Sequence, residues 1–348
     1  MITMTMNDNS LRLPAEWEPQ QSVLIAWPHK DTDWSYMLDE VTDCYINLAH
    51  AILRFANLII VSPDSSPVRD LLSDCDMGRI AFLDVPTNDT WTRDYGAITT
   101  LTPSGSPVYN DFCFNGWGLK FASNHDNLVT RKMKFSGLLA GHYRNELGFV
   151  LEGGSIESDG NGTLLTTRQC LMSPNRNGDL SRREISHYLK KVFGLRKVLW
   201  LDHGFLEGDD TDSHIDTLAR FAPNNTIIYV GCDDPADPHY DELNAMRADL
   251  RAMRNADGEA FNLLELPMAD SAYDEDNQRL PATYANFLVI NNGVLLPTYG
   301  SPGKDRLAAQ ILKIAFPDHE IVPVDCRALI RQHGSLHCAT MQFPIINF

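Results

Sequence analysis

A short internal repeat is the feature of this sequence that most constrains its fold. Residues 162–167 (Gly-Thr-Leu-Leu-Thr-Thr) are nearly copied by residues 293–298 (Gly-Val-Leu-Leu-Pro-Thr), and each copy precedes a turn and then a stretch of helical periodicity. Similar short apolar runs, typical of buried strands, alternate with amphipathic segments along the chain. An open doubly wound sheet is disfavoured, because no glycine-rich nucleotide turn follows the first apolar run at residues 22–28.

Four polar residues also recur at a similar spacing. Asp94 and Glu152 are 58 positions apart, Glu152 and His214 are 62 apart, and His214 and Cys338 are 124 apart, which is twice 62. A ring of five similar units would produce this spacing, because equivalent loops in repeat architectures converge on one axis. Coincidence is the alternative. The pattern favours an α/β fold, a five-bladed pseudo-symmetric propeller.

The length and composition favour one domain. With 348 residues, 43% of them hydrophobic, the chain can bury a large core, and no linker divides it. We therefore predict a single domain over residues 11–348, preceded by a flexible polar tail at residues 1–10. The chain has no stretch of the roughly 18 apolar residues that a membrane-spanning helix needs, and its N-terminus lacks a signal-peptide pattern.

Charge and cysteine content narrow the partners and the compartment. The net charge of −17 disfavours nucleic acid as a partner, since phosphate binding requires a basic surface. It fits a small cationic substrate, although acidity for solubility alone is the alternative. Seven cysteines without a CxxC pair predict reduced thiols and a cytoplasmic location.

Cys338 is the candidate nucleophile. It follows the small-residue pair Gly334 and Ser335, in a context unlike that of the other six cysteines. A cysteine attacks well only as a thiolate, which a nearby histidine or a bound cation stabilises. The alternative is a buried structural thiol in a terminal strand.

His214 is the candidate proton carrier. It lies two residues from Asp216 on a predicted strand at residues 214–221, so both side chains would face one side. A hydrogen-bonded structural histidine is the alternative. His337 is adjacent to Cys338 and would point away from it in an extended chain, so we predict that His337 serves packing.

Asp94 and Asp216 are candidate ligands for a cation. Two carboxylates in a partly buried pocket repel each other unless a cation lies between them, and a planar guanidinium matches two such acceptors. Trp91, three residues before Asp94, could stack on the same cation or belong to the core.

A metal site is the competing arrangement. It would use His214, Asp216 and Cys338, with His203 or Cys232 as further ligands. Zinc sites usually contain close pairs such as HExxH or CxxC, and this sequence has neither. A serine hydrolase is disfavoured because no GxSxG motif occurs. We therefore predict neither a metal nor an organic cofactor.

Six segments resemble the agmatine deiminase and bacterial-type peptidylarginine deiminase family over nearly the whole chain. In order they are LPAEWEPQ at 13–20, WTRDYG at 91–96, FNGWGLK at 114–120, LEGGSI at 151–156, DTDSHIDT at 210–217 and GSLHC at 334–338. Two departures are visible: Ala97 stands where the family often has proline, and Ser335 where a second glycine is common.

This resemblance implies a fold and a mechanism. The fold is the five-bladed α/β propeller of the guanidine-modifying, or pentein-type, superfamily. Cys338 would attack the guanidinium carbon, and His214 would protonate the leaving ammonia and then activate water. Asp94 and Asp216 would hold the guanidinium nitrogens, and Glu152 would orient His214. A covalent thiouronium intermediate divides one difficult substitution into two easier ones.

The expected reaction is hydrolysis of agmatine to N-carbamoylputrescine and ammonia, in putrescine biosynthesis. Deimination of peptidylarginine or another guanidino compound, amidino transfer and non-catalytic guanidinium binding are the alternatives. A homo-oligomer is compatible with the sequence.

Agmatine is favoured over arginine by the residues near the expected pocket. Trp91 and Trp117 are expected to contact the substrate, and acids are frequent nearby, at Asp209, Asp210 and Asp212. Arg93 and Arg220 could form structural ion pairs or clamp a substrate carboxylate.

Overall fold

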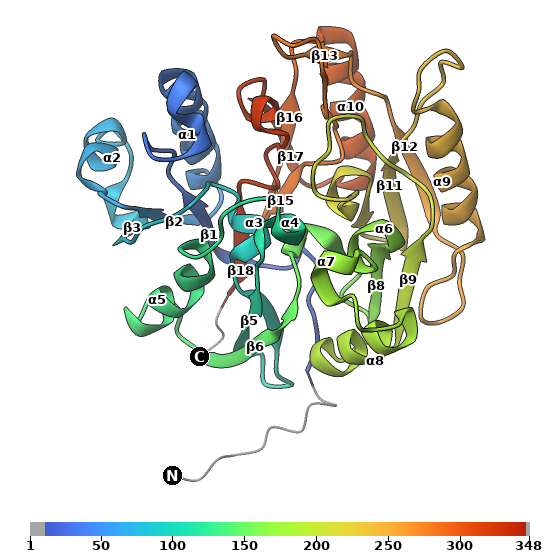
Figure 1. The fold of residues 1–348 in the computed structure, drawn as a ribbon, viewed down its shortest axis with the longest axis horizontal. Helices are drawn as coiled ribbons and strands as arrows, with labels where there is room; N and C mark the ends of the chain where they lie inside the picture. The colour runs from blue at the N-terminus through green and yellow to red at the C-terminus, as the bar shows by residue number, and fades with distance from the viewer. Residues whose placement is uncertain (1–10, 346–348) are drawn as a thin grey trace.

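The computed structural model describes residues 11–345 of the chain. The predicted tail at residues 1–10 lies outside this range, as do the last three residues of the predicted domain. Within the described residues the main strands form five sheets of three or four strands each. In Figure 1 these sheets lie around the short central elements α3 (Thr92–Tyr95) and α4 (Gly116–Leu119).

The strands of each sheet are close neighbours in sequence, with one exception. The first sheet has the order β18 (Met341–Pro344), β1 (Gln20–Ala26), β2 (Asn57–Ser62) and β3 (Ile80–Asp84), so its first strand comes from the C-terminus. The other four sheets are, in chain order, β4 (Ile98–Leu101), β5 (Pro107–Cys113) and β6 (His142–Val150); β7 (Ile156–Ser158), β8 (Thr163–Thr167) and β9 (Lys197–Leu201); β10 (Ala219–Ala222), β11 (Thr226–Val230) and β12 (Asn262–Leu266); and β15 (Leu288–Ile290), β16 (Gly293–Thr298) and β17 (Glu320–Asp325). A separate ribbon joins β13 (Ala272–Tyr273) to β14 (Arg279–Leu280).

One pairing pattern recurs in the five sheets. The first strand pairs antiparallel with the second, and the second pairs parallel with the third. The near copies in the sequence are the middle strands β8 and β16 of two such sheets. The repeat therefore marks equivalent positions in two units, as the sequence predicts.

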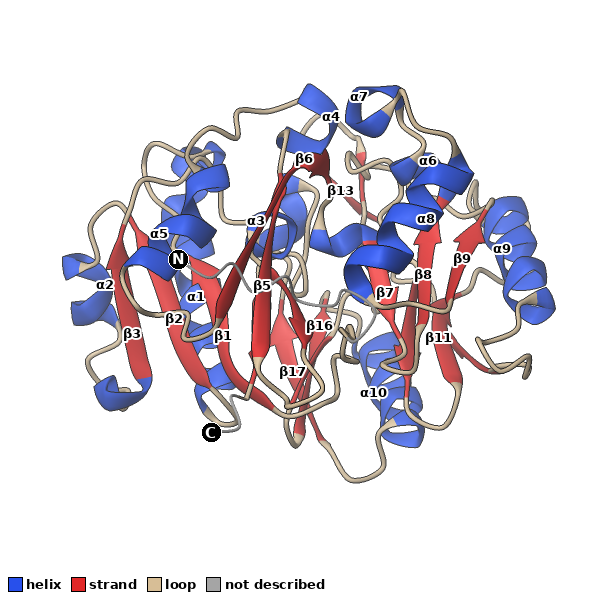
Figure 2. Ribbon diagram, turned by 90° about the horizontal axis from the view of Figure 1, so that it is seen from below, coloured by secondary structure: helices blue, strands red, loops and turns tan. Residues whose placement is uncertain are grey.

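Helices connect the parallel strands and lie beside the sheets, as Figure 2 shows for α8, α9 and α10. The longer helices are α1 (Leu38–Leu53), α8 (Arg182–Phe193), α9 (Tyr240–Ala252) and α10 (Pro302–Ala315), and the shorter ones are α2 (Ser66–Leu71), α5 (Val129–Phe135), α6 (Arg168–Leu171) and α7 (Pro174–Asn177). The sequence locates α8 well, because its ends carry strong signals. Ser181 and Glu184 form a capping box at its start, and Gly194 ends it in the left-handed conformation with φ 67°.

Apolar clusters fill the space between consecutive sheets. Leu165 and Leu201 of the third sheet pack in one cluster with Ile227 of the fourth, and Ile228 of the fourth packs in another with Leu296 of the fifth. The remaining sheets share the largest cluster. None of the helices in residues 11–345 is long and apolar enough to cross a membrane.

The predicted strand at residues 214–221 is wrong in part. Ile215–Thr217 is a turn of 3-10 helix, and the strand runs only over Ala219–Ala222. Before the 3-10 turn the Asp209 carboxylate accepts hydrogen bonds from the backbone N–H groups of Thr211 and Ser213, which replaces the ladder bonds of a strand.

Candidate active site

The structure brings together the five residues that the sequence singles out for catalysis. Asp94 lies in α3, Glu152 precedes the 3-10 turn Gly153–Ser155, and His214 and Asp216 flank or lie in the turn Ile215–Thr217. Cys338 lies in a turn just before β18, and not in the terminal strand itself. All five are buried, with exposed fractions of 3%, 0%, 0%, 0% and 5% in chain order.

Gly154 lies at the point where three of these side chains converge. A Cβ atom there would be 2.7 Å from His214 Nδ1, 2.9 Å from Asp94 Oδ1 and 3.1 Å from Asp216 Oδ2. Only glycine leaves room for this approach. His214 Nδ1 is itself 3.6 Å from Asp94 Oδ1. The Glu-Gly-Gly motif therefore allows an imidazole and two carboxylates to meet.

Cys338 faces one of these carboxylates and an amide. Its Sγ is 3.8 Å from Asp216 Oδ2, and Asn286 Nδ2 donates a hydrogen bond to the sulfur at 3.2 Å. The Asn286 oxygen accepts from the backbone N–H of Cys338 at 3.2 Å, which fixes the turn. Burial raises the pKa of the Cys338 thiol well above its ordinary value, and the nearby Asp216 and Asp94 raise it further. No sequence motif points to Asn286.

The two carboxylates are held differently. Asp94 accepts hydrogen bonds from Trp117 Nε1 at 2.9 Å and from the Gly154 backbone N–H at 3.0 Å. Burial nevertheless raises its pKa well above the usual range, and repulsion from Asp216 adds to this. Burial is also the largest influence on Asp216 and acts to raise its pKa, but the hydrogen bond with His337 and the nearby positive charges together outweigh burial, and the pKa is lowered.

Trp117 is held by an unusual backbone turn. The four residues of α4, from Gly116 to Leu119, have positive φ values of 66°, 54°, 83° and 70°, so the element is one left-handed turn. A non-glycine residue in this conformation costs roughly 1–2 kcal/mol. The indole N–H of Trp117 reaches Asp94 from this turn. Trp117, which the sequence places at the substrate, therefore contacts a carboxylate of the site directly.

Trp91 has its predicted place in the core, and its predicted stacking on a cation stays a prediction. Its ring packs against Trp34 with centroids 5.7 Å apart, and it is buried. Gly334 allows this packing, because a Cβ there would be 2.3 Å from Trp91 Cζ3. Another part of the ring lines a cavity with Cys338. Trp91 belongs to the core and also forms part of the wall of the site.

Glu152 and His214 are near each other without being hydrogen-bonded. Glu152 accepts two hydrogen bonds from Arg176 Nε, at 2.9 and 3.0 Å, and Arg176 has no sequence signal that predicts this contact. Neither ring nitrogen of His214 has a hydrogen-bond partner among residues 11–345. Burial lowers the pKa of His214 to about 3, which keeps the imidazole neutral.

The geometry gives little support to a metal site, which is the competing arrangement from the sequence. Glu152, Cys170 and His214 have potential ligand atoms within 4.8 Å of one another, but Arg176 already binds Glu152. His203 instead bonds to Asp249, away from the site. A second group, His50, Asp74 and Cys75, lies at the surface and includes no residue of the site.

Cys338, Asp94 and the two tryptophans line a cavity with an empty volume of about 390 Å³, here called the front cavity. Three further aspartates line it, Asp33, Asp89 and Asp210, and none of the lining residues is lysine or arginine. Burial raises the pKa of Asp89 to about 7 and that of Asp210 to about 6. His214 and Asp216 lie behind this wall, next to Asp94 and Cys338.

The other predicted acids serve the loop that carries Asp210. Asp209 bonds to the backbone of this loop, and Asp212 pairs with Arg176 at 2.5 Å and with Lys120 at 2.9 Å. Of the three acids that the sequence places at the pocket, only Asp210 is in its wall.

Arg93 and Arg220 face away from the front cavity. Arg220 pairs with Glu16 at 2.9 Å and with Glu157, and Arg93 Nη2 lies 3.7 Å from Glu16. Both arginines therefore take part in structural ion pairs. The alternative in which they clamp a substrate carboxylate in this cavity is wrong.

His337 does more than the predicted packing. Its ring is buried, and its two nitrogens contact Asp216 Oδ2 at 2.7 Å and Glu16 Oε2 at 2.6 Å. The sequence shows neither contact, because Glu16 and Asp216 are far from His337 along the chain.

Comparison with known proteins identifies the family of the chain. The sequence profile of the Porphyromonas-type peptidyl-arginine deiminase family matches residues 12–344. A solved structure described as a putative arginine deiminase from Porphyromonas gingivalis is 51% identical with a TM-score of 0.91, and the match covers 96% of this chain and 98% of that one. A cysteine-to-serine variant of the agmatine deiminase of C. jejuni, solved with substrate bound, is 38% identical with a TM-score of 0.89 and 97% of both chains covered.

A curated relative gives the same result. The agmatine deiminase of Stutzerimonas stutzeri is 32% identical, and the match covers 99% of this chain and 98% of the relative. The chain described here belongs to the Porphyromonas-type peptidyl-arginine deiminase family.

Proposed function

We propose that this protein is an agmatine deiminase, which hydrolyses agmatine to N-carbamoylputrescine and ammonia. The observation that carries the proposal is the unbalanced charge of the site. Two buried carboxylates, Asp94 and Asp216, lie beside the Cys338 thiol, and the front cavity has no lysine or arginine in its wall. Such a site is complemented by a cation. The relatives named agmatine deiminase, one of them solved with substrate, support the same reaction.

In the first half-reaction the Cys338 sulfur forms a bond to the guanidinium carbon. Burial keeps the thiol protonated and His214 neutral in the free protein. A bound guanidinium adds positive charge beside the sulfur, so the thiol proton can pass to the imidazole. The imidazolium then donates that proton to the departing nitrogen. The C–N bond breaks, ammonia leaves, and a positively charged S-alkylthiouronium remains on Cys338.

In the second half-reaction water replaces the sulfur. His214 accepts one proton from water as the water oxygen bonds to the same carbon, the C–S bond breaks, and the second water proton passes to the departing Cys338 sulfur, which leaves the urea product and the free thiol; His214 then loses its proton to solvent. Asp94 and Asp216 hold the planar group in place during both steps, which supplies the positioning and electrostatic terms. Glu152, fixed by Arg176, keeps a negative charge near His214 when the ring is protonated. No step requires a metal or an organic cofactor.

The wall of the front cavity favours agmatine over arginine. Agmatine has an ammonium group where arginine also has a carboxylate, and Asp33, Asp89 and Asp210 line the cavity without any lysine or arginine in its wall. A carboxylate brought next to these acids in a partly buried cavity would cost several kcal/mol. We expect kcat/KM for agmatine to exceed that for arginine by at least about a hundredfold, or roughly 2.7 kcal/mol.

A turnover panel tests this assignment. Ammonia release would be measured with agmatine, free arginine and an arginine-containing peptide under the same conditions. Comparable turnover of arginine, or preference for the peptide, would contradict agmatine as the substrate and leave the deiminase chemistry standing. Failure of all three to release ammonia would support a non-catalytic binding protein.

We also propose that residues 11–348 form one catalytic domain arranged as a five-bladed propeller. Five sheets with one pairing pattern, and apolar clusters between successive sheets, support this arrangement. The cysteines of the described residues are all free thiols, which supports the cytoplasm as the compartment. The net charge of −17 supports a small cation, and not nucleic acid, as the partner.

A further inference from the structure

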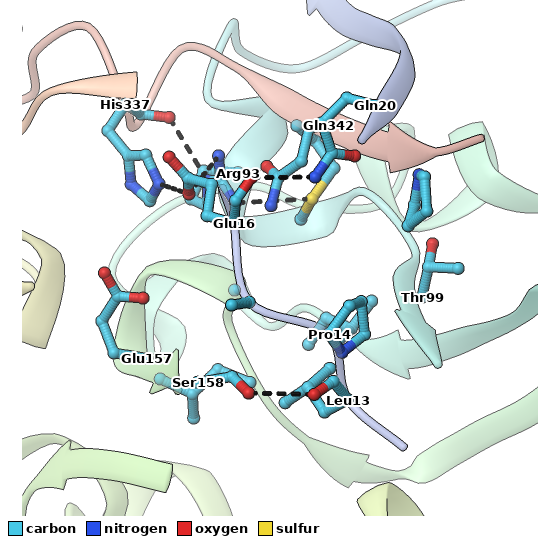
Figure 3. Close-up of a pocket in the computed structure, with 16 residues that line it drawn as sticks. Leu13, Pro14, Glu16, Gln20, Arg93, Thr99, Glu157, Ser158, His337 and Gln342 are labelled. Carbon is cyan, nitrogen blue, oxygen red and sulfur yellow. Dashed lines mark hydrogen bonds and ion pairs between the residues drawn. The ribbon is translucent and has the colours of Figure 1, made fainter. Parts of the chain in front are cut away.

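A second cavity lies behind the proposed active site. Its empty volume is about 570 Å³, and its polar wall includes Glu16, Arg93, Glu157 and His337. Figure 3 shows Glu16 between the His337 ring and Arg93 in this rear cavity. The two cavities share no lining residue, but they meet at two neighbouring pairs. Arg93 and His337 line the rear cavity, whereas Asp94 and Cys338, which follow them in sequence, line the front one.

The His337 ring connects the two sides. Nδ1 lies 2.7 Å from Asp216 Oδ2, and Nε2 lies 2.6 Å from Glu16 Oε2. An ionised carboxylate can only accept hydrogen bonds, so a ring bonded to one at each nitrogen must donate from both. Glu16 Oε2 also lies 2.9 Å from Arg220 Nη2 and 3.7 Å from Arg93 Nη2, so this carboxylate has cations on its other sides. One carboxylate at each ring nitrogen is the geometry of a ring that donates from both.

The charged groups around this ring are balanced only with its proton. On the rear side are Glu16, Arg93, Arg220 and Glu157, and the Arg93 Nε donates to the His337 backbone oxygen at 3.4 Å. On the front side are Asp216, Asp94, His214 and Cys338. Glu16, Glu157 and Asp216 supply three carboxylates, and Arg93, Arg220 and His337 supply three cationic groups, whereas Asp94 is a further carboxylate that a bound guanidinium would complement. Loss of the His337 charge leaves Asp216 as the uncompensated anion nearest the reacting sulfur.

We propose that His337 is a positioning residue for the reaction proposed above, on which this inference rests. Held from behind by Glu16, its ring fixes Asp216 through Oδ2 and keeps that carboxylate ionised beside the thiol and Asp94. Oδ1 of Asp216 has no hydrogen-bond partner among residues 11–345, so it is left free for a guanidinium N–H. His337 does not touch the substrate. It sets the charge and direction of the carboxylate that does.

The His337→Asn variant separates charge from hydrogen bonding. The asparagine Nδ2 can occupy the place of the histidine Nδ1 and donate to Asp216, but it carries no charge and does not reach Glu16. Without the adjacent cation the pKa of Asp216 rises, so Asp216 is ionised only at higher pH. The acid limb of kcat/KM should move to higher pH by about one unit, which is a tenfold loss on that limb. KM should rise more than kcat falls, and activity should approach the wild type at high pH.

Two comparisons exclude a merely structural role. Glu157→Gln alters a buried carboxylate of the same network that bonds to Arg220 and not to His337, so its acid limb should stay in place. His337→Ala opens space beside the rear cavity, and added imidazole should restore its activity, because an imidazolium can bridge Glu16 and Asp216 again.

The proposal has clear failing outcomes. An unchanged acid limb and KM in His337→Asn would overturn it, as would a Glu157→Gln shift of the same size. If the His337 variants do not fold, Glu16→Gln tests the same link from the rear, and an unmoved acid limb there would equally refute it. Wild-type enzyme that releases no ammonia from agmatine would instead reject the proposed function, so the two failures are distinguishable.

Discussion

Acidic side chains line both the front and the rear cavity, but only the acids of the rear cavity are paired with arginines. Behind the site, Glu16 and Glu157 face Arg93 and Arg220, and each charge has an opposite partner. In front, Asp33, Asp89, Asp94 and Asp210 face one another with no lysine or arginine in the wall. Uncompensated buried charge is costly unless a ligand completes it. The balanced cavity therefore supports the fold, whereas the unbalanced one is the place where we propose that a cation binds.

The largest expected effect is the loss of turnover when the proposed nucleophile of the front cavity is removed and its carboxylates are kept. Cys338→Ala should abolish turnover, with a loss of at least about 10⁴-fold, because the proposed nucleophile is absent. Agmatine binding should persist, since Asp94 and Asp216 remain. Steady-state ammonia release and calorimetric titration measure the two quantities. Full activity in this variant would end the assignment of Cys338 as nucleophile.

The second prediction concerns the folding stability lost when a positive charge is removed from the ion pairs behind the site. Arg220→Met leaves Glu16 and Glu157 buried without their main partner, and breaking a buried ion pair this way typically costs about 3–5 kcal/mol of folding free energy. Urea denaturation measures the change. Arg196→Met is the matched control, because Arg196 pairs with Asp257 at the surface and such pairs contribute roughly 0–1 kcal/mol. Equal losses in the two variants would remove the distinction between the cavities.

The third prediction concerns the folding stability gained when a cation binds in the front cavity. Agmatine should stabilise Cys338→Ala against urea, by about 2.7 kcal/mol at a concentration of 100 Kd. Asp94→Asn in the same background should lose most of this gain, because one of the two carboxylates is neutralised. Arginine should stabilise far less than agmatine. A gain that survives Asp94→Asn would place the cation elsewhere.

The last prediction is that removal of metal ions has no effect on the rate. Exhaustive dialysis against a chelator should leave the rate with agmatine unchanged, because the proposed steps use only side chains and water. Zinc should restore nothing after this treatment. Loss of activity that zinc recovers would return the group Glu152, Cys170 and His214 to consideration as a metal site.

The sequence predicts the parts of this molecule that depend on local pattern. Apolar runs predict most strands, and Gly194 predicts the end of α8. The residues that converge on Gly154 belong to short motifs with unusual composition, so they can be selected before their contacts are known. The family resemblance adds roles that the spacing alone does not supply.

The rest depends on contacts between distant segments. The predicted strand at 214–221 fails because Asp209 bonds to the backbone of the preceding loop, and Asp212 and Ser213 adopt positive φ values of 67° and 62°. Arg176 and Asn286 carry no motif of their own. The sequence predicts only packing for His337, because it is next to Cys338 and nothing local indicates that Glu16, far away along the chain, bonds to its ring.

The pairing of β18 with β1 determines when the site can form during synthesis of the protein chain. Cys338 comes three residues before β18, the last strand of the chain, and that strand takes its place only by joining a strand made near the start. A nascent chain holds Asp94, Glu152, His214 and Asp216 long before its thiol can be anchored. The thiol can therefore be anchored in the site only after β18 has been made and has paired with β1.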